Sequence, residues 1–251
     1  TFDVNVIGTA KVFEVARSCP KLKAIVNVTT DKCYENDGRS AGYKEGDRMG
    51  GHDPYSSSKG CSELVTSCYK RSFFESSDVG LASARAGNVI GGGDWADDRL
   101  IPDILRSFEK NGSVLIRNPN ATRPWQYVLE PLSGYLLLAE NLYEEPTKFS
   151  EGWNFGPHEE DVKPVSWILN QMISKFPNSS WQVDSSDKPH EADFLKLDIS
   201  KSKSKLGWKP LWGLGKALEQ IISWNQSWLN KENMQVVCLA EIKNYMKDMN
   251  K

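Results

Sequence analysis

The sequence lacks the features of membrane, secreted and metal-binding proteins. No apolar run approaches the roughly 20 residues that a membrane-spanning helix needs, and the first residues show no signal-peptide pattern. The five cysteines are odd in number, scattered and without a Cys-x-x-Cys pair, and the three histidines lie far apart. These absences argue against a disulfide framework and a zinc site and predict a reducing, cytoplasmic setting.

An excess of charge of one sign is also missing. The net charge is -2, the pI is about 6.0 and no basic stretch is present, so neither nucleic acid nor a membrane is an expected partner. The composition, 39% hydrophobic and 25% charged, is ordinary for one globular domain, or one domain with a small lobe, and 251 residues suffice to bury a core.

A glycine-rich dinucleotide fingerprint, G-x-G-x-x-G, is absent as well. The run Gly91–Gly93 has the wrong spacing and follows a late strand rather than the first one. The chain begins at Thr1 without a methionine and enters at once into a helical pattern. We therefore expect a fragment.

What the sequence does contain is an alternation of helical and strand patterns. Apolar residues at helical spacing predict a helix over residues 2–18, and a β-branched run predicts a buried strand over 23–28. Asp53 and Pro54 suit the start of a helix that runs to about residue 74. Residues 79–86 form the next strand, and the order predicts an α/β, doubly wound parallel sheet.

After residue 86 the alternation is looser. We expect a glycine-rich loop over 87–98 and, at the C-terminus, a helical tail that packs on the domain, with an appended amphipathic helix as the alternative. Further helices are expected over residues 100–109, 131–143, 165–176 and 214–229, and strands over 113–117, 152–156, 181–184 and 194–197.

Tyr55 and Lys59 stand four residues apart at the start of a predicted helix, and so on one helical face. A cation there favours the phenolate form of tyrosine, whose ordinary pKa is about 10, and so favours a general base. The same spacing also fits an exposed helical pair without a function.

A second polar cluster, Thr29-Thr30-Asp31-Lys32, directly follows the predicted strand 23–28. In open α/β sheets, ligands bind beyond the carboxyl ends of the strands. An acid, a hydroxyl and an amine in succession supply a proton donor, a hydrogen-bonding group and a possible base. An ordinary polar turn capped by Asp31 is the alternative.

Together the two clusters carry a resemblance. A strand ending in threonine, a Tyr-x-x-x-Lys helix about 25 residues later and a strand leading into residues 85–91 resemble the extended short-chain dehydrogenases. Within that family the likeness is to the CDP-glucose 4,6-dehydratases, and it runs from residue 1 to about 229. It rests on residues 30–36, 87–100, 117–140, 153–157 and 189–192.

The resemblance implies a partial Rossmann-type doubly wound parallel sheet with a smaller C-terminal substrate-binding lobe. We expect residues 1–90 to form the C-terminal half of the NAD-binding domain and 91–230 a substrate lobe interleaved with late Rossmann elements. Residues 231–251 form a helical tail. In such enzymes the glycine-rich motif lies in the first strand–helix turn, which here would precede Thr1, so we expect an incomplete enzyme.

The resemblance also implies a reaction: CDP-glucose is converted to CDP-4-keto-6-deoxyglucose by internal hydride transfer through NAD. Tyr55 would deprotonate the C4 hydroxyl, Lys59 would support the phenolate and the nicotinamide ribose, and Thr30 would hydrogen-bond the C4 oxygen. Asp31 would act as the acid toward C6. Lys32 stands where dTDP-glucose dehydratases carry a glutamate base, and would need a neutral amine to replace it.

Four residues are candidate substrate ligands. Arg99 and Arg123 suit the substrate diphosphate, because a guanidinium fork matches phosphate oxygens. Asn88 lies in the same region, and His190 belongs to a segment that approaches the nucleotide in the family. Surface salt bridges and a surface histidine are the alternatives. The complete enzyme is expected to form a homo-oligomer.

Two other functions stay open. A nucleotide-sugar 4-epimerase needs the tyrosine–lysine pair but no acid–base pair for eliminating water, so Asp31 and Lys32 argue against it. An inactive fragment that at most binds ligands or dimerises is the second alternative.

Overall fold

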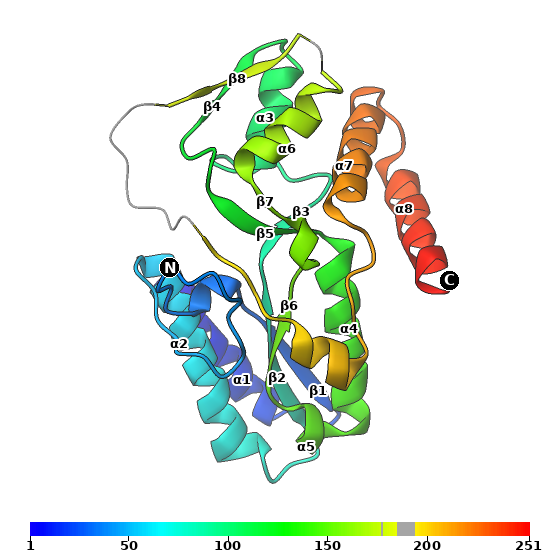
Figure 1. Ribbon diagram of the computed structural model, residues 1–251. Coiled ribbons are helices and arrows are strands. Elements are labelled where there is room, and N and C mark those ends of the chain that lie inside the picture. The colour runs from blue at the N-terminus through cyan, green and yellow to red at the C-terminus, as the bar shows by residue number, and fades with distance from the viewer. Residues whose placement is uncertain (177, 185–193) are drawn as a thin grey trace. The chain divides into compact units, whose positions relative to one another are not determined.

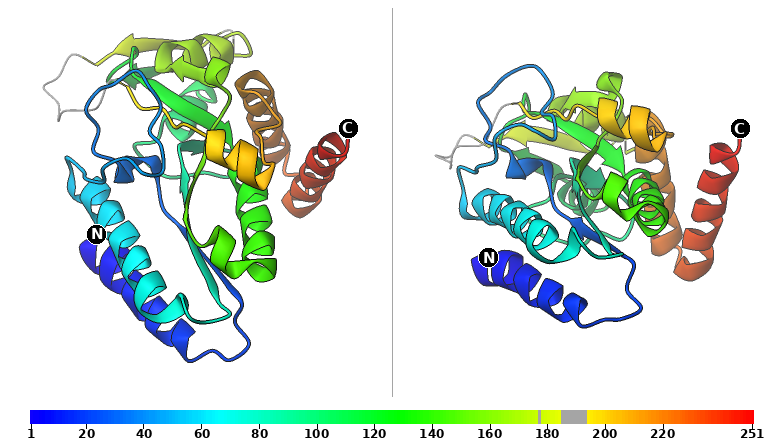
Figure 2. Two further views of the ribbon diagram at one scale, coloured as in Figure 1. Left: turned by 60° about the horizontal axis from the view of Figure 1, so that its bottom comes forward. Right: turned by 90° about the horizontal axis from the view of Figure 1, so that it is seen from below.

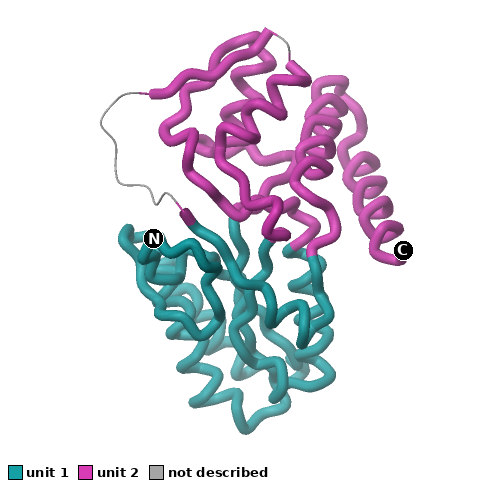
Figure 3. The backbone as a smooth tube through the Cα atoms, viewed as in Figure 1, with its two compact units in different colours: residues 1–87, 131–156, 195–209 teal, residues 88–130, 157–194, 210–251 magenta. Residues whose placement is uncertain are grey.

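The chain, described by a computed structural model at residues 1–176, 178–184 and 194–251, divides into two interleaved units (Figure 3). Unit 1 contains residues 1–87, 131–156 and 195–209. Unit 2 contains residues 88–130, 157–194 and 210–251.

Unit 1 is built on a parallel sheet of three strands in the order β1-β2-β6 (Figure 1). Its strands are β1 (Ala24–Val28), β2 (Gly80–Ala86) and β6 (Gly152–Phe155), with Val28 opposite Ala84 and Ala86 opposite Phe155. All of β2 is buried, as expected for a parallel strand between two neighbours and covered on both faces. The prediction that strands 23–28 and 79–86 are parallel neighbours is confirmed.

Helices cover both faces of this sheet (Figures 1 and 2). One face carries α1 (Thr9–Arg17), which continues the π-helical segment η1 (Asp3–Gly8), and α2 (Pro54–Tyr69), which runs on into η3 (Lys70–Phe74). The other face carries α4 (Leu129–Glu144), whose Leu138 and Leu142 pack with buried strand residues. Three shorter segments complete unit 1: η2 (Asp31–Cys33), α5 (Pro146–Phe149) and η5 (Ser202–Leu206).

Unit 2 contains two small sheets. In the first, β5 (Thr122–Tyr127) lies between β3 (Asn88–Ile90), to which it is parallel, and β7 (Val162–Pro164), to which it is antiparallel. In the second, β4 (Ser113–Ile116) pairs in parallel with β8 (Ser180–Val183). The helical segments of unit 2 are α3 (Leu100–Phe108), η4 (Glu159–Asp161), α6 (Val165–Ile173), α7 (Leu214–Leu229) and α8 (Met234–Met249).

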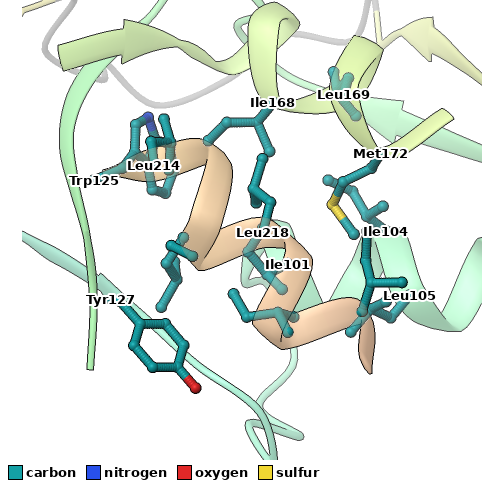
Figure 4. Packing of buried hydrophobic residues seen from close by; sticks show 14 of the residues in the cluster. Ile101, Ile104, Leu105, Trp125, Tyr127, Ile168, Leu169, Met172, Leu214 and Leu218 are labelled. Atoms are coloured by element: carbon teal, nitrogen blue, oxygen red, sulfur yellow. The ribbon is translucent and has the colours of Figure 1, made fainter. Parts of the chain in front are cut away.

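The core of unit 2 forms around α7. Leu214, Leu218 and Ile221 lie on one face of this helix at helical spacing, and all three are buried. Figure 4 shows this face packed against apolar side chains of α3 and α6, including Ile104 and Ile168. The helix predicted over 214–229 is therefore confirmed, together with the reason for its apolar period.

The tail packs on unit 2 as predicted. Tyr245 of α8 is buried beside Trp212, at a ring-centroid distance of 5.0 Å, and donates a hydrogen bond of 2.8 Å to the buried carboxylate of Glu130. Helix α8 is therefore attached to unit 2 through Tyr245.

One strand prediction was wrong, and some strands were not predicted. Residues 194–197 form no strand: Phe194 and Leu197 make only isolated bridges, to two different partners, Thr122 and Tyr43. The loop expected over 87–98 begins with strand β3, and strands β5 and β7 were not predicted. The sequence does not predict β5, because its buried residues include the polar Arg123 and Gln126 and so show no alternation of apolar and polar positions.

Candidate active site

The carboxyl end of β1 turns sharply into η2, and this turn places a hydroxyl beside an acid. Thr30 is extended and caps η2, with its Oγ1 accepting a hydrogen bond of 3.3 Å from the Lys32 backbone N–H. The Thr30 hydroxyl donates to Asp31 Oδ1 at 3.0 Å, and the two side chains are 8% and 2% exposed. A threonine hydroxyl and a carboxyl group thus lie together, almost without solvent, directly after β1.

The start of α2 follows from its cap. Asp53 accepts hydrogen bonds from the backbone N–H groups of Tyr55 and Ser56, at 2.9 and 3.0 Å, and Pro54 occupies the first helical turn. Tyr55 therefore sits in the first turn with its side chain 44% exposed, accessible to a substrate. The Lys32 Nζ lies 5.9 Å from the centroid of the Tyr55 ring, so η2 and α2 bring these two predicted residues together.

Lys59 follows Tyr55 by one turn of α2 and is half-buried. Burial lowers the pKa of Lys59, and the charge of Glu63, a further turn along the helix, partly restores it. The predicted helical placement of Tyr55 and Lys59 is thus confirmed, and their roles stay predictions.

Between helix α2 and strand β2 lies a buried ion pair that the sequence interpretation missed. Arg85 of β2 donates from Nε to Glu63 Oε1 at 2.9 Å and from Nη2 to Glu63 Oε2 at 2.8 Å. The Ser83 hydroxyl donates to the same carboxylate at 2.6 Å, and so does the Thr29 hydroxyl. The side chains of Arg85 and Glu63 are 4% and 2% exposed. One carboxylate therefore ties together the end of β1, helix α2 and strand β2.

Arg85 also connects the ion pair to Tyr34 and, through it, to Asn154. Arg85 Nη1 donates to the Tyr34 hydroxyl at 2.8 Å and to the Glu45 carbonyl at 3.0 Å, and the Tyr34 hydroxyl donates to Asn154 Oδ1 at 2.7 Å. Burial would raise the pKa of Glu63, but the hydrogen bonds and charge of Arg85 outweigh it and hold that pKa below its usual value.

Each member of this pair stands out in the sequence by itself. Glu63 repeats the four-residue spacing of Tyr55 and Lys59, and Arg85 interrupts a strand of small and apolar residues. A buried arginine inside such a strand requires a partner.

The predicted substrate ligands lie in unit 2. Asn88 opens β3 opposite Trp125 of β5, and Arg123 stands two residues before Trp125, so Asn88 and Arg123 share one face of this sheet. Arg123 is buried and donates to the Thr122 carbonyl at 3.0 Å, whereas Arg99 is exposed at the start of α3. The fourth predicted ligand, His190, falls outside the described residues.

The described residues contain neither a metal-site cluster nor a membrane-spanning helix. In residues 1–176, 178–184 and 194–251, no cluster of histidine, cysteine or acidic side chains has the arrangement of a metal site. Over the same ranges, no helix combines the length and apolar character needed to span a membrane.

A helix-covered parallel sheet, a hydroxyl–acid pair after one strand and a Tyr-x-x-x-Lys helix after that pair define a Rossmann-type enzyme of the short-chain dehydrogenase class. A family model described as GDP-mannose 4,6 dehydratase matches residues 1–221, and the chain belongs to this family.

Two relatives show how far the similarity extends. The chain is 54% identical over 252 residues to the CDP-glucose 4,6-dehydratase of Salmonella typhimurium, covering 98% of this chain and 70% of that protein. It is 22% identical over 246 residues to a dTDP-glucose 4,6-dehydratase of Xanthomonas campestris, covering 90% of this chain and 67% of the relative.

Solved structures of low sequence identity share the fold. The dTDP-glucose 4,6-dehydratase of Bacillus anthracis, in complex with NAD, superposes with a TM-score of 0.75 at 20% identity, covering 90% of this chain and 68% of that one. The UDP-glucuronic acid 4-epimerase of Bacillus cereus, with UDP-glucuronic acid and NAD, gives 0.76 at 19% identity, covering 87% and 66%. The predicted fold class is confirmed.

Proposed function

We propose that the chain carries the catalytic residues of a nucleotide-sugar 4,6-dehydratase that converts CDP-glucose to CDP-4-keto-6-deoxyglucose with NAD. The 54% identity to a CDP-glucose 4,6-dehydratase supports the substrate. The observation that carries the proposal is the buried Thr30–Asp31 pair, joined through η2 to Lys32 near the Tyr55 ring. It combines the groups for oxidation at C4 with an acid for the loss of water.

The overall reaction oxidises C4 of the glucose, eliminates water across C5 and C6, and reduces C6, so the sugar undergoes no net change in oxidation state. Such a reaction needs a carrier that removes a hydride and returns it, and NAD supplies this chemistry when bound. Tyr55 and Lys59 fit the nicotinamide end of the cofactor: one side chain is accessible, and the other is a half-buried cation suited to ribose hydroxyls.

Tyr55 removes the proton of the C4 hydroxyl while the hydride leaves carbon C4. The ammonium group of Lys59 stabilises the phenolate form of Tyr55. Thr30 hydrogen-bonds the C4 oxygen as it becomes a ketone. This ketone acidifies the hydrogen on C5, which makes the following elimination possible.

Asp31 then protonates the C6 hydroxyl, which leaves as water. Asp31 is 2% exposed, and the hydrogen bond that Thr30 donates to its Oδ1 holds the carboxyl group in place after β1. Lys32 is the proposed base for the C5 proton and has to release its own proton first. Asn88, Arg99 and Arg123 hold the nucleotide diphosphate.

A deuterium-transfer experiment tests the proposal. The product of the complete reading frame that contains residues 1–251 is incubated with NAD and CDP-glucose carrying deuterium at C4. A dehydratase yields a product lighter by one water, with deuterium at C6. An epimerase yields a product of unchanged mass with deuterium still at C4. Unaltered CDP-glucose would refute both activities.

Two features of the biological setting belong to the same proposal. All five cysteines are free, which agrees with a reducing cytoplasm. Assembly into a homo-oligomer stays a prediction, and sedimentation velocity of the same protein tests it.

A further inference from the structure

The glycine run after β3 lies directly against an indole ring. A methyl group added at Gly92 would overlap Trp224 of α7, lying 2.8 Å from Cδ1 and closer still to two other ring carbons. At Gly93 the added methyl would lie 3.2 Å from the far edge of the same ring, and its φ of +77° favours glycine. The glycines here allow the backbone to approach a tryptophan, rather than to cradle a phosphate.

Trp224 is itself held from two sides. Its Nε1 donates to Cys238 Sγ of α8 at 3.3 Å, and its ring stacks with Trp228 at a centroid distance of 6.2 Å and an interplanar angle of 9°. Trp224 is 8% exposed, whereas Trp228 is 46% exposed. The matched family segment ends at residue 221, so these three residues lie beyond it.

The loop returns to the same indoles a few residues later. Trp95 packs at 6.0 Å from the Trp224 ring and 5.1 Å from the Trp228 ring. Its carbonyl then accepts a hydrogen bond of 3.1 Å from Arg106 of α3. The segment 91–99 is thus fixed at its glycines, at Trp95 and at α3.

This segment connects two of the proposed diphosphate ligands. Asn88 precedes it on β3, and Arg99 ends it at the start of α3. Its conformation therefore sets where Arg99 stands relative to Asn88 and to Arg123 on the neighbouring strand β5.

We infer that Trp224 is a positioning residue, which holds the segment 91–99 so that Asn88 and Arg99 bind the diphosphate of a nucleotide sugar. The inference rests on the proposed function for the identity of the ligand. It assigns to the C-terminal part of the chain, α7 and α8, a part in substrate affinity rather than in the chemical steps.

The test combines a variant that should clash with Trp224, Gly92→Ala, with a variant that removes part of the Trp224 ring. In the product of the complete reading frame, Gly92→Ala should push the segment off Trp224 and weaken CDP-glucose binding by about 10- to 100-fold, as the loss of a hydrogen bond to a charged group does. KM should rise with little change in kcat, because Tyr55 and Asp31 are untouched. Gly215→Ala, on the same helix α7 with open space around its Cβ, is the matched control and should bind normally.

Trp224→Leu removes part of the obstructing ring, so Gly92→Ala should cost little further affinity in that background, about threefold at most. Trp95→Ala is a second variant, exposed enough to fold normally, and should also raise KM alone. Calorimetric titration with CDP-glucose and steady-state kinetics supply both readouts.

The outcomes separate the two proposals. Failure of the unchanged protein to bind CDP-glucose overturns the proposed substrate and the inference together. Normal binding by the unchanged protein and by Gly92→Ala overturns the inference alone. So does an additive loss in the double variant, because the damage would then not pass through Trp224. Should Gly92→Ala fail to fold, unchanged KM in Trp95→Ala is sufficient to overturn the inference.

Discussion

Replacing Arg85 by methionine is a demanding test of how the site is held. Arg85 donates two hydrogen bonds to Glu63, one to Tyr34 and one to the Glu45 carbonyl, and both members of the ion pair are almost fully buried. Methionine fills much of the same volume but donates nothing. The Glu63 carboxylate would keep only the hydroxyl donors Ser83 and Thr29.

The cost follows from this geometry. Removing one member of a buried pair leaves an uncompensated charge, which typically lowers the free energy of unfolding by about 3–5 kcal/mol. The matched control is Arg48→Met, also in unit 1, because Arg48 pairs with Glu35 at 2.7 Å with side chains 84% and 49% exposed. An exposed pair contributes about 1 kcal/mol or less.

Urea unfolding at neutral pH, followed by circular dichroism, measures Arg85→Met, Arg48→Met, Glu63→Gln and the double variant Glu63→Gln/Arg85→Met. The double variant should lose less stability than the sum of its single variants, because the orphaned charge is gone. A loss for Arg85→Met no larger than for Arg48→Met, or strict additivity in the double variant, would refute the view that this ion pair holds β1, α2 and β2 together.

Four further outcomes are expected. Tyr55→Phe should slow oxidation at C4 by about 10²–10⁴-fold, measured in single-turnover kinetics, without changing the thermal unfolding temperature, since this side chain is 44% exposed. Asp31→Asn should retain part of the C4 oxidation but slow dehydration, so NADH absorbance should build up during turnover; normal turnover without it would exclude the acid role. The folded state lowers the pKa of Glu63, so the ionised carboxylate stabilises the fold above its unfolded pKa of about 4.3. This stabilisation is lost as the pH falls through the folded pKa. Urea midpoints measured below about pH 4.3 should therefore fall less steeply in Glu63→Gln than in the unchanged protein. Residues 1–251 expressed alone should bind no NAD in calorimetric titration, because they contain no glycine-rich fingerprint, and micromolar binding would contradict this.

The parts of the fold that were predictable have local causes. Helix α7 was predicted with its observed bounds because its apolar residues repeat at helical spacing and face a single core. The start of α2 was predictable because Asp53 and Pro54 act within one turn. The adjacency of β1 and β2 followed from the strand–helix–strand order, since such units close in a right-handed crossover.

The features that were missed depend on partners distant in sequence. Glu63 and Arg85 are 22 residues apart, and nothing local identifies them as a pair. Gly92 and Trp224 are separated in sequence by most of unit 2. The glycine run could therefore be predicted as a loop, but its contact with the Trp224 ring could not. A buried polar residue in a strand is the signal that deserves more weight, because it must have a partner somewhere in the fold.

The pair Thr29–Thr30 shows how one local rule divides a polar cluster into support and chemistry. Consecutive residues of an extended chain point to opposite sides, so two adjacent threonines at the end of β1 cannot serve the same group. The Thr29 hydroxyl donates to Glu63 in the buried network, and the Thr30 hydroxyl donates to Asp31. Because Thr29 is committed to the ion pair, it fixes the end of β1, and Thr30 is presented from a rigid support. Thr29→Val should therefore reduce stability while leaving the proposed chemistry in place, whereas Thr30→Val should impair oxidation at C4 with the fold intact; the reverse result would exchange the two roles.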